Sequence, residues 1–202
     1  MPNPQLYLAS QSPRRRTLIE QLGLSFQTLA VDIDERLKQG EEPPAFVKRL
    51  ALEKARTGWQ QVSHQHIPVV GADTCIVLNH QIVGKPADKQ QGIALLKQYA
   101  ENTHSVLTGI AIVGPGNDGS NATVKEKVRV STSFVTFRAL SDEDCEQYWQ
   151  TGEPLGKAGG YAIQGIAAAF IEKLEGSYSG VMGLPLCELA ELMPAFGIKL
   201  FD

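Results

Sequence analysis

Ile67-Pro68-Val69-Val70-Gly71-Ala72-Asp73 is an apolar run that leads into an acidic residue, and it predicts a buried strand that ends at Asp73. Ligands bind beyond the strand ends of α/β sheets, so an aspartate at this point is a candidate metal ligand or general base. An aspartate that caps a turn is the alternative interpretation. Residues 75–78 and 81–83 flank Asn79-His80 and predict a tight hairpin directly after this strand.

Around this segment, helical and strand patterns alternate along the chain, which is typical of a mixed α/β domain. We expect further strands at residues 6–9, 26–31, 106–113, 124–137 and 167–174, and helices at 13–22, after Pro43-Pro44, at 88–99, from Ser141 onward and at 185–193. Residues 114–121 are the clearest loop and connect the two longest strands as a hairpin. The sequence has no repeat or linker, so it predicts one domain over residues 1–202, either undivided or bilobal.

Composition excludes several classes of protein. The 202 residues are 43% hydrophobic and carry a net charge of -3, which argues against binding to nucleic acid or membrane surfaces through bulk electrostatics. No apolar run approaches the roughly 20 residues that span a bilayer, and the N-terminus lacks a signal-peptide pattern, so we expect a cytoplasmic protein. Cys75, Cys145 and Cys187 lie among apolar residues without a CxxC pair, which favours packing roles in a reducing compartment.

The first candidate site is Ser10-Gln11-Ser12-Pro13-Arg14-Arg15, which follows the first expected strand. Ser12 is a favourable helix N-cap, and a proline fits the first helical position after it. The free N–H groups of that first turn, together with the Ser10 hydroxyl and the Arg14 and Arg15 side chains, are typical of an anion-binding site. A capped helix with solvated arginines is the alternative.

Two lysines and a glycine-rich segment are further candidates. Lys85 follows the expected hairpin and can return to the side of Asp73, whereas Asp88 is better explained as a helix N-cap. Lys54 shares the apolar side of its helix, which is unusual for a solvated lysine, although a snorkelling side chain is an alternative. Lys157-Ala158-Gly159-Gly160-Tyr161-Ala162-Ile163-Gln164-Gly165 suggests backbone that approaches a planar or anionic group, but it lacks the spacing of known phosphate loops.

Taken in order, these motifs resemble those of the Maf-type nucleotide pyrophosphatases, also called septum-formation inhibitor proteins. The resemblance covers nearly the whole chain and rests on Ser10-Gln11-Ser12-Pro13-Arg14-Arg15, Arg49-Leu50-Ala51 with Lys54-Ala55, Gly71-Ala72-Asp73-Thr74, Lys85-Pro86, Thr103-His104 with Thr108-Gly109, and the glycine-rich segment. It implies an inosine-triphosphatase-like α/β/α fold, with a long mixed sheet and a cleft between two lobes.

The resemblance also implies roles for individual residues. Asp73 corresponds to the family's aspartate base, and Glu35 corresponds to a glutamate that helps to hold Mg²⁺ or Mn²⁺ with Asp73. The residues on the phosphate side correspond to Ser10, Arg14, Arg15, Lys54 and Lys85. Arg14, Thr74 and Gln164 match the branch that acts on dTTP and UTP rather than the branch that acts on 7-methyl-GTP. Gly156 departs from the family, which often has aspartate there.

The implied activity is hydrolysis of dTTP and UTP, or of modified pyrimidine nucleotides, to the monophosphate and pyrophosphate. The resemblance implies a house-cleaning or division-linked role, and it alone implies a homodimer. Two alternatives remain open, namely an enzyme that removes or transfers a single phosphate and a non-enzymatic regulator of cell division. The presence of Asp73, Lys54 and Lys85 together argues against the non-enzymatic alternative.

Overall fold

The computed structural model describes residues 4–116 and 123–201, and these ranges form one seven-stranded sheet. The strands are β1 (Leu6–Leu8), β2 (Phe26–Thr28), β3 (Val69–Leu78), β4 (Gln81–Val83), β5 (Thr103–Pro115), β6 (Val124–Phe137) and β7 (Ile171–Glu175). Their order is β2-β1-β3-β5-β6-β7, and β4 pairs with β3. β1 runs parallel to β2 and β3, and the remaining pairs are antiparallel, so the expected mixed sheet is confirmed.

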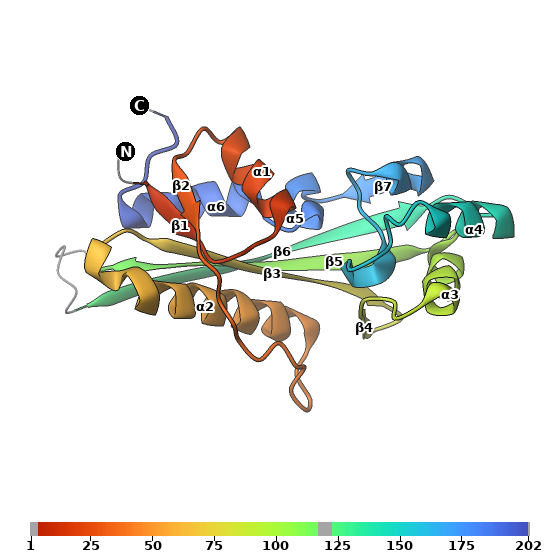
Figure 1. Cartoon of the computed structure of the whole chain (residues 1–202), viewed down its shortest axis with the longest axis horizontal. Coiled ribbons are helices and arrows are strands. Elements are labelled where there is room, and N and C mark those ends of the chain that lie inside the picture. Colours follow the sequence, from red (N-terminus) through yellow and green to blue (C-terminus); the bar gives the residue numbers. More distant parts are fainter. Residues whose placement is uncertain (1–3, 117–122, 202) are drawn as a thin grey trace.

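Helices lie on both faces of this sheet. They are α1 (Pro13–Gln21), α2 (Pro43–Val62), α3 (Lys89–Tyr99), α4 (Asp142–Gln150), α5 (Tyr178–Met182) and α6 (Leu186–Leu192). α2 lies along one face of the long strands, α1, α5 and α6 lie on the other, and α3 and α4 lie at one end (Figure 1). Within the described ranges, no helix is long and apolar enough to cross a membrane.

Polar residues mark most helix starts as expected. Asp88 is the N-cap of α3, where its carboxylate accepts a hydrogen bond from the Gln91 N–H at 2.8 Å. Ser141 starts α4 through a capping box with Asp144. Ser12 occupies the N-cap position of α1, but its side chain makes no capping hydrogen bond, so that part of the expectation is wrong. The Ser12 N–H instead donates to the Ser10 hydroxyl at 3.2 Å.

The expected end of a strand at Asp73 is wrong, because β3 continues through this residue to Leu78. Its continuation is rich in β-branched and apolar residues, and each residue from Val69 to Val77 is paired with β5. Asp73 is directly opposite Gly109 in the middle of the pairing rather than at an edge. The carboxylate is therefore held by two long strands and not by a turn.

Three other sequence expectations need correction. The expected strand at 167–174 begins as a 3-10 helix, Ile166–Phe170, because the Glu153 carboxylate accepts the N–H groups at its start, and only then becomes β7. The strand expected at residues 26–31 is shorter, because β2 ends at Thr28, where its pairing with the three residues of β1 ends. Cys75 and Cys145 are buried as expected, but Cys187 is exposed on the outer side of α6.

The hairpin expected around residues 114–121 is confirmed in its strands, since β5 and β6 are antiparallel partners from Thr103 and Thr136 to Pro115 and Val124. Residues 117–122 of that loop lie outside the described residues. The two strands have 13 and 14 residues, so they run through the whole length of the sheet and join its two ends.

The backbone of α2 lies directly on the sheet at two glycines. A Cβ atom at Gly71 would lie 2.3 Å from the carbonyl oxygen of Ala51, and one at Gly109 would lie 2.2 Å from that of Val47. Neither distance is possible for a real side chain, so both positions require glycine for close approach rather than for backbone conformation. This contact sets the height of α2 above β3 and β5.

We expect Gly109→Ala to lower the free energy of unfolding by about 3 kcal/mol, because the added methyl group would force α2 away from the sheet. Chemical denaturation followed by circular dichroism measures this loss. Gly84→Ala is the matched control, since a Cβ atom there meets no atom within 4 Å. Equal stability of the two variants would contradict the close-packing argument.

Candidate active site

A cleft of about 830 Å³ lies between the start of α1, α2, the middle of β3, β4, the glycine-rich segment and the end of α5. A volume of this size is typical of small-ligand sites. All nine residues singled out from the sequence line it: Ser10, Arg14, Arg15, Glu35, Lys54, Asp73, Thr74, Lys85 and Gln164. The fold therefore brings together residues that are separated by up to 154 positions along the chain.

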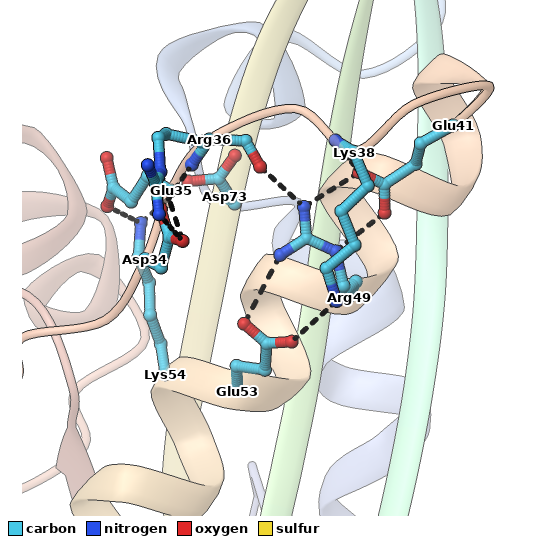
Figure 2. Close-up of polar contacts among 9 residues, drawn as sticks. All are labelled: Asp34, Glu35, Arg36, Lys38, Glu41, Arg49, Glu53, Lys54 and Asp73. Atoms are coloured by element: carbon cyan, nitrogen blue, oxygen red, sulfur yellow. Dashed lines mark hydrogen bonds and ion pairs between the residues drawn. The ribbon is translucent and has the colours of Figure 1, made fainter.

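The centre of the cleft is a lysine between two carboxylates. Lys54 Nζ lies 2.6 Å from Asp73 Oδ1 and 2.6 Å from Glu35 Oε1. Lys54 and Asp73 are buried, at 9% and 8% exposure, whereas the Glu35 side chain is 58% exposed. Figure 2 shows Lys54 extending from α2 toward both acids. Buried charges need partners, and this arrangement supplies them.

The pKa of Glu35 reports the positive surroundings of this acid. Partial burial acts to raise its pKa, but the hydrogen bond and charge of Lys54 act in the opposite direction, and Lys85 and Arg15 add to them. The pKa of Glu35 is therefore lowered, which keeps the carboxylate ionised. Glu35 thus faces the cations of the cleft as an anion.

The loop that carries Glu35 is clamped to α2 by Arg49. The Arg49 guanidinium makes hydrogen bonds of 2.6 and 2.7 Å to the two carboxylate oxygens of Glu41, and it donates to the Arg36 carbonyl at 3.1 Å (Figure 2). The hydrogen bonds from Arg49 lower the pKa of Glu41 to about 2. These bonds fix the part of the loop that directly follows Glu35.

The two adjacent arginines at the start of α1 differ in how they are held. Arg15 donates from Nε to the Gly183 carbonyl at 2.7 Å, and from Nη1 and Nη2 to Ser10 and Thr74 at 3.3 and 3.4 Å. Burial lowers its pKa, although the nearby Asp73 charge opposes this effect. Arg14 also lines the cleft. The sequence motif therefore supplies two cleft arginines, of which Arg15 is fixed by neutral oxygens.

The glycine-rich segment closes the other side of the cleft. Gly159 and Gly160 have φ angles of 68° and 70°, which favour glycine, and the Gly159 N–H donates to the Gly84 carbonyl at 3.0 Å. That bond ties the segment to the residue before Lys85. Lys85 and Gln164 both line the cleft but are exposed, so Lys85 differs from the buried Lys54.

Two features of the site go beyond the sequence expectations, although Tyr161 belongs to the glycine-rich segment that the sequence singled out. Tyr161 lines the cleft, and its hydroxyl pairs with Nε2 of the buried His104 at 2.7 Å. Burial lowers the pKa of His104 to about 4, so this histidine is neutral at pH 7. Residues 181–183, at the end of α5, also form a wall of the cleft. The helices expected from the sequence did not include α5, which spans Tyr178–Met182.

The carboxylates fit a hard divalent cation that is shared with a ligand. Among the described residues, no group of three or more His, Cys, Asp or Glu side chains could hold a metal by itself. However, Asp73 and Glu35 each reach the same Lys54 Nζ, so their carboxylates lie close together. Mg²⁺ is typically held by one or two carboxylates plus phosphate oxygens, which is the donor set that these two acids can complete.

Comparisons with known proteins find relatives of this chain over nearly its whole length. A family model described as Maf-like protein matches residues 5–196. The dTTP/UTP pyrophosphatase of Alkalilimnicola ehrlichii is 48% identical over 199 residues, which cover 96% of this chain and 94% of that protein. The dTTP/UTP pyrophosphatase of Aromatoleum aromaticum is 45% identical over 208 residues, which cover 97% of each.

Among solved structures, the Staphylococcus aureus Ham1 protein aligns with 65% of this chain and 71% of its own, with 13% identity and a TM-score of 0.41. The sequence matches are far stronger, because the family model and the relatives cover nearly the whole chain, and the relatives do so at 45–48% identity. On that ground the chain belongs to the Maf family.

Proposed function

We propose that this chain hydrolyses UTP and dTTP, and modified pyrimidine triphosphates of the same shape, to the monophosphate and pyrophosphate. The observation that carries the proposal is the convergence of Lys54, Asp73 and Glu35 inside a cleft that also contains Arg14, Arg15 and Lys85. The names of the full-length relatives support the same substrates.

The proposed task of the cations is to neutralise the triphosphate. A nucleoside triphosphate carries about four negative charges, which repel any nucleophile that approaches phosphorus. Arg14, Arg15 and Lys85 line the cleft with positive charge, and the Ser10 hydroxyl adds a polar group beside Arg15. Charge-assisted hydrogen bonds to phosphate oxygens are the strongest contacts that these side chains can make.

Asp73 is the proposed general base, because it is a buried carboxylate at the centre of the cleft. It accepts a proton from a water molecule that attacks the α-phosphorus, and Lys54 holds its carboxylate in place. Asp73 and Glu35 are also the proposed ligands of Mg²⁺ or Mn²⁺. When bound, such an ion supplies charge neutralisation at phosphate oxygens and lowers the pKa of coordinated water.

The wider setting is part of the same proposal. Residues 1–202 act as one catalytic domain in the cytoplasm, where free Cys75, Cys145 and Cys187 suit a reducing environment. The activity removes nucleotides in a house-cleaning or division-linked role, and the enzyme assembles as a homodimer. The alternative that it releases a single phosphate differs in its product, since only attack at the α-phosphorus yields pyrophosphate.

We expect UTP and dTTP to be cleaved at least tenfold faster than CTP, ATP or GTP, with pyrophosphate as the product. The hydrogen-bonding edge of uracil and thymine presents a carbonyl acceptor, an N–H donor and a second carbonyl acceptor. The Gln164 amide lines the cleft, where its oxygen can accept from that N–H and its NH2 group can donate to a carbonyl. A panel of triphosphates with separate assays for phosphate and pyrophosphate measures this. Release of phosphate alone, or faster cleavage of GTP than of UTP, would overturn the proposal.

We expect Asp73→Asn to lower kcat by on the order of 100-fold or more, because the amide keeps the shape of the side chain but accepts no proton. The control is Asp142→Asn, which removes an acid with an 85% exposed side chain at the start of α4. Thermal melting of both variants separates loss of activity from loss of fold. A folded Asp73→Asn protein with activity within a few-fold of wild type would falsify the assignment.

Activity should require a divalent cation and disappear in excess EDTA. The two acids near Lys54 offer hard oxygen ligands, which favour Mg²⁺ or Mn²⁺ over softer metals. Titration of each metal into enzyme from which EDTA has removed the metal should restore turnover. Glu35→Gln should need a higher metal concentration than wild type to reach half of its maximal turnover. Undiminished turnover in EDTA would remove the metal from the proposal.

A further inference from the structure

A chain of hydrogen bonds crosses the molecule beneath the cleft, from α1 through β3 and β5 to α5. Arg15 Nη2 donates to Thr74 Oγ1 at 3.4 Å, Thr74 Oγ1 and Thr108 Oγ1 lie 2.9 Å apart, and the Thr108 hydroxyl donates to the Gly180 carbonyl at 2.7 Å. Thr74 and Thr108 are directly opposite each other on the paired strands. Thr108 is only 1% exposed, so its hydroxyl depends on Thr74 and the Gly180 carbonyl for hydrogen bonds.

The direction of every bond in this chain follows from counting protons. A threonine hydroxyl has one proton to donate. Thr108 gives its proton to the Gly180 carbonyl, which can only accept, so Thr108 must accept from Thr74. Thr74 therefore has no proton left for a ligand, and its oxygen accepts from Arg15. The Gly180 carbonyl thus determines the hydrogen-bonding role of each side chain back to the guanidinium.

The same helix holds Arg15 from a second side. The Gly183 carbonyl, at the end of α5, accepts from Arg15 Nε at 2.7 Å, so α5 contacts the guanidinium directly and through the two threonines. Together with the Ser10 contact, neutral oxygens receive three of the five N–H groups that a guanidinium offers. A guanidinium held in this way keeps its full charge and a fixed orientation for the ligand in the cleft.

We propose that Thr108 is a positioning residue, which acts through Thr74 to hold Arg15 in the orientation that binds the triphosphate. This inference rests on the proposed function for the identity of the ligand, but the chain of bonds itself does not. It also assigns Thr74 to the support of Arg15. Thr108 does not line the cleft, so its effect on substrate must pass through other residues.

Kinetics of Thr108→Val test the proposal, because valine keeps the shape of the side chain and breaks both bonds of its hydroxyl. We expect KM for UTP to rise about tenfold while kcat changes less than threefold, since Arg15 contacts phosphate in both ground and transition states. Thr108→Ser should restore KM to within about twofold of wild type, because it restores the hydroxyl. A change in kcat alone, or a serine variant as poor as the valine variant, would overturn the proposal.

Two controls separate positioning from general loosening. Thr103→Val makes the same change on the same strand, at an exposed threonine that pairs with Thr136 at 2.8 Å, and should leave KM unchanged. Ser177→Ala removes the N-cap bond of α5, in which the Ser177 hydroxyl accepts from the Gly180 N–H at 2.9 Å, without touching Arg15 or the threonines. If Ser177→Ala raised KM as much as Thr108→Val, and Thr108→Ser failed to restore KM, the effect would belong to the stability of α5 and the proposal would fail.

A double-mutant cycle with Arg15→Met gives a readout that does not depend on turnover. Binding of inorganic tripolyphosphate, measured by calorimetry at one fixed Mg²⁺ concentration, should weaken in Thr108→Val but not weaken further when Thr108→Val is added to Arg15→Met. Additive losses, or no binding by the wild type, would overturn the positioning role. Coupled losses in a protein that cleaves no triphosphate would support this role while the proposed function fails.

Discussion

The contact between the backbone of α2 and the sheet is the constraint on which the rest of the site depends. At Gly71 and Gly109 the helix carbonyls lie where a side chain would otherwise stand. Only at this separation does Lys54, one turn beyond Leu50 on the buried side of α2, reach Asp73 in the middle of β3. The glycines therefore help to set the geometry of the charge pair, and Gly109 lies directly opposite Asp73 in the pairing of β3 with β5.

Burial of that charge pair explains why the neighbouring charges are arranged as they are. A buried lysine is unfavourable unless anions compensate it, and Asp73 and Glu35 both contact its Nζ atom. Glu35 comes from an exposed loop, which is tied to α2 by the bidentate bonds of Arg49 to Glu41. Lys54 is thus a buried cation that is compensated by carboxylates, whereas Arg14, Arg15 and Lys85 have greater access to a ligand. The two groups of cations therefore suit different tasks.

The sequence located most of the helices and strands and nine residues that line the cleft, but the two results have different origins. Periodicity and caps located α3 and α4 because Asp88 and Ser141 act through local hydrogen bonds. Local patterns singled out Ser10, Lys54 and Asp73 as separate candidates. Only the resemblance joined such candidates into one site and added Glu35 and Thr74. The errors are non-local as well: β3 passes Asp73 because β5 pairs along its length, and residues 166–170 form a 3-10 helix because Glu153 binds their N–H groups.

The sequence by itself determined the mixed α/β class, the starts of the capped helices and the chemical types present in the motifs, because all of these follow from neighbours a few positions apart. Only the tertiary structure decided which charges are paired, which are exposed and which hydroxyl groups have a proton free to donate to a ligand. Lys54 and Lys85 both occur in motifs, yet one is buried between carboxylates and the other is exposed. Thr74 accepts from Arg15 because a carbonyl in α5 receives the proton of Thr108. The direction of a hydrogen bond and the burial of a charge depend on all groups around a side chain, and those groups come from distant parts of the chain.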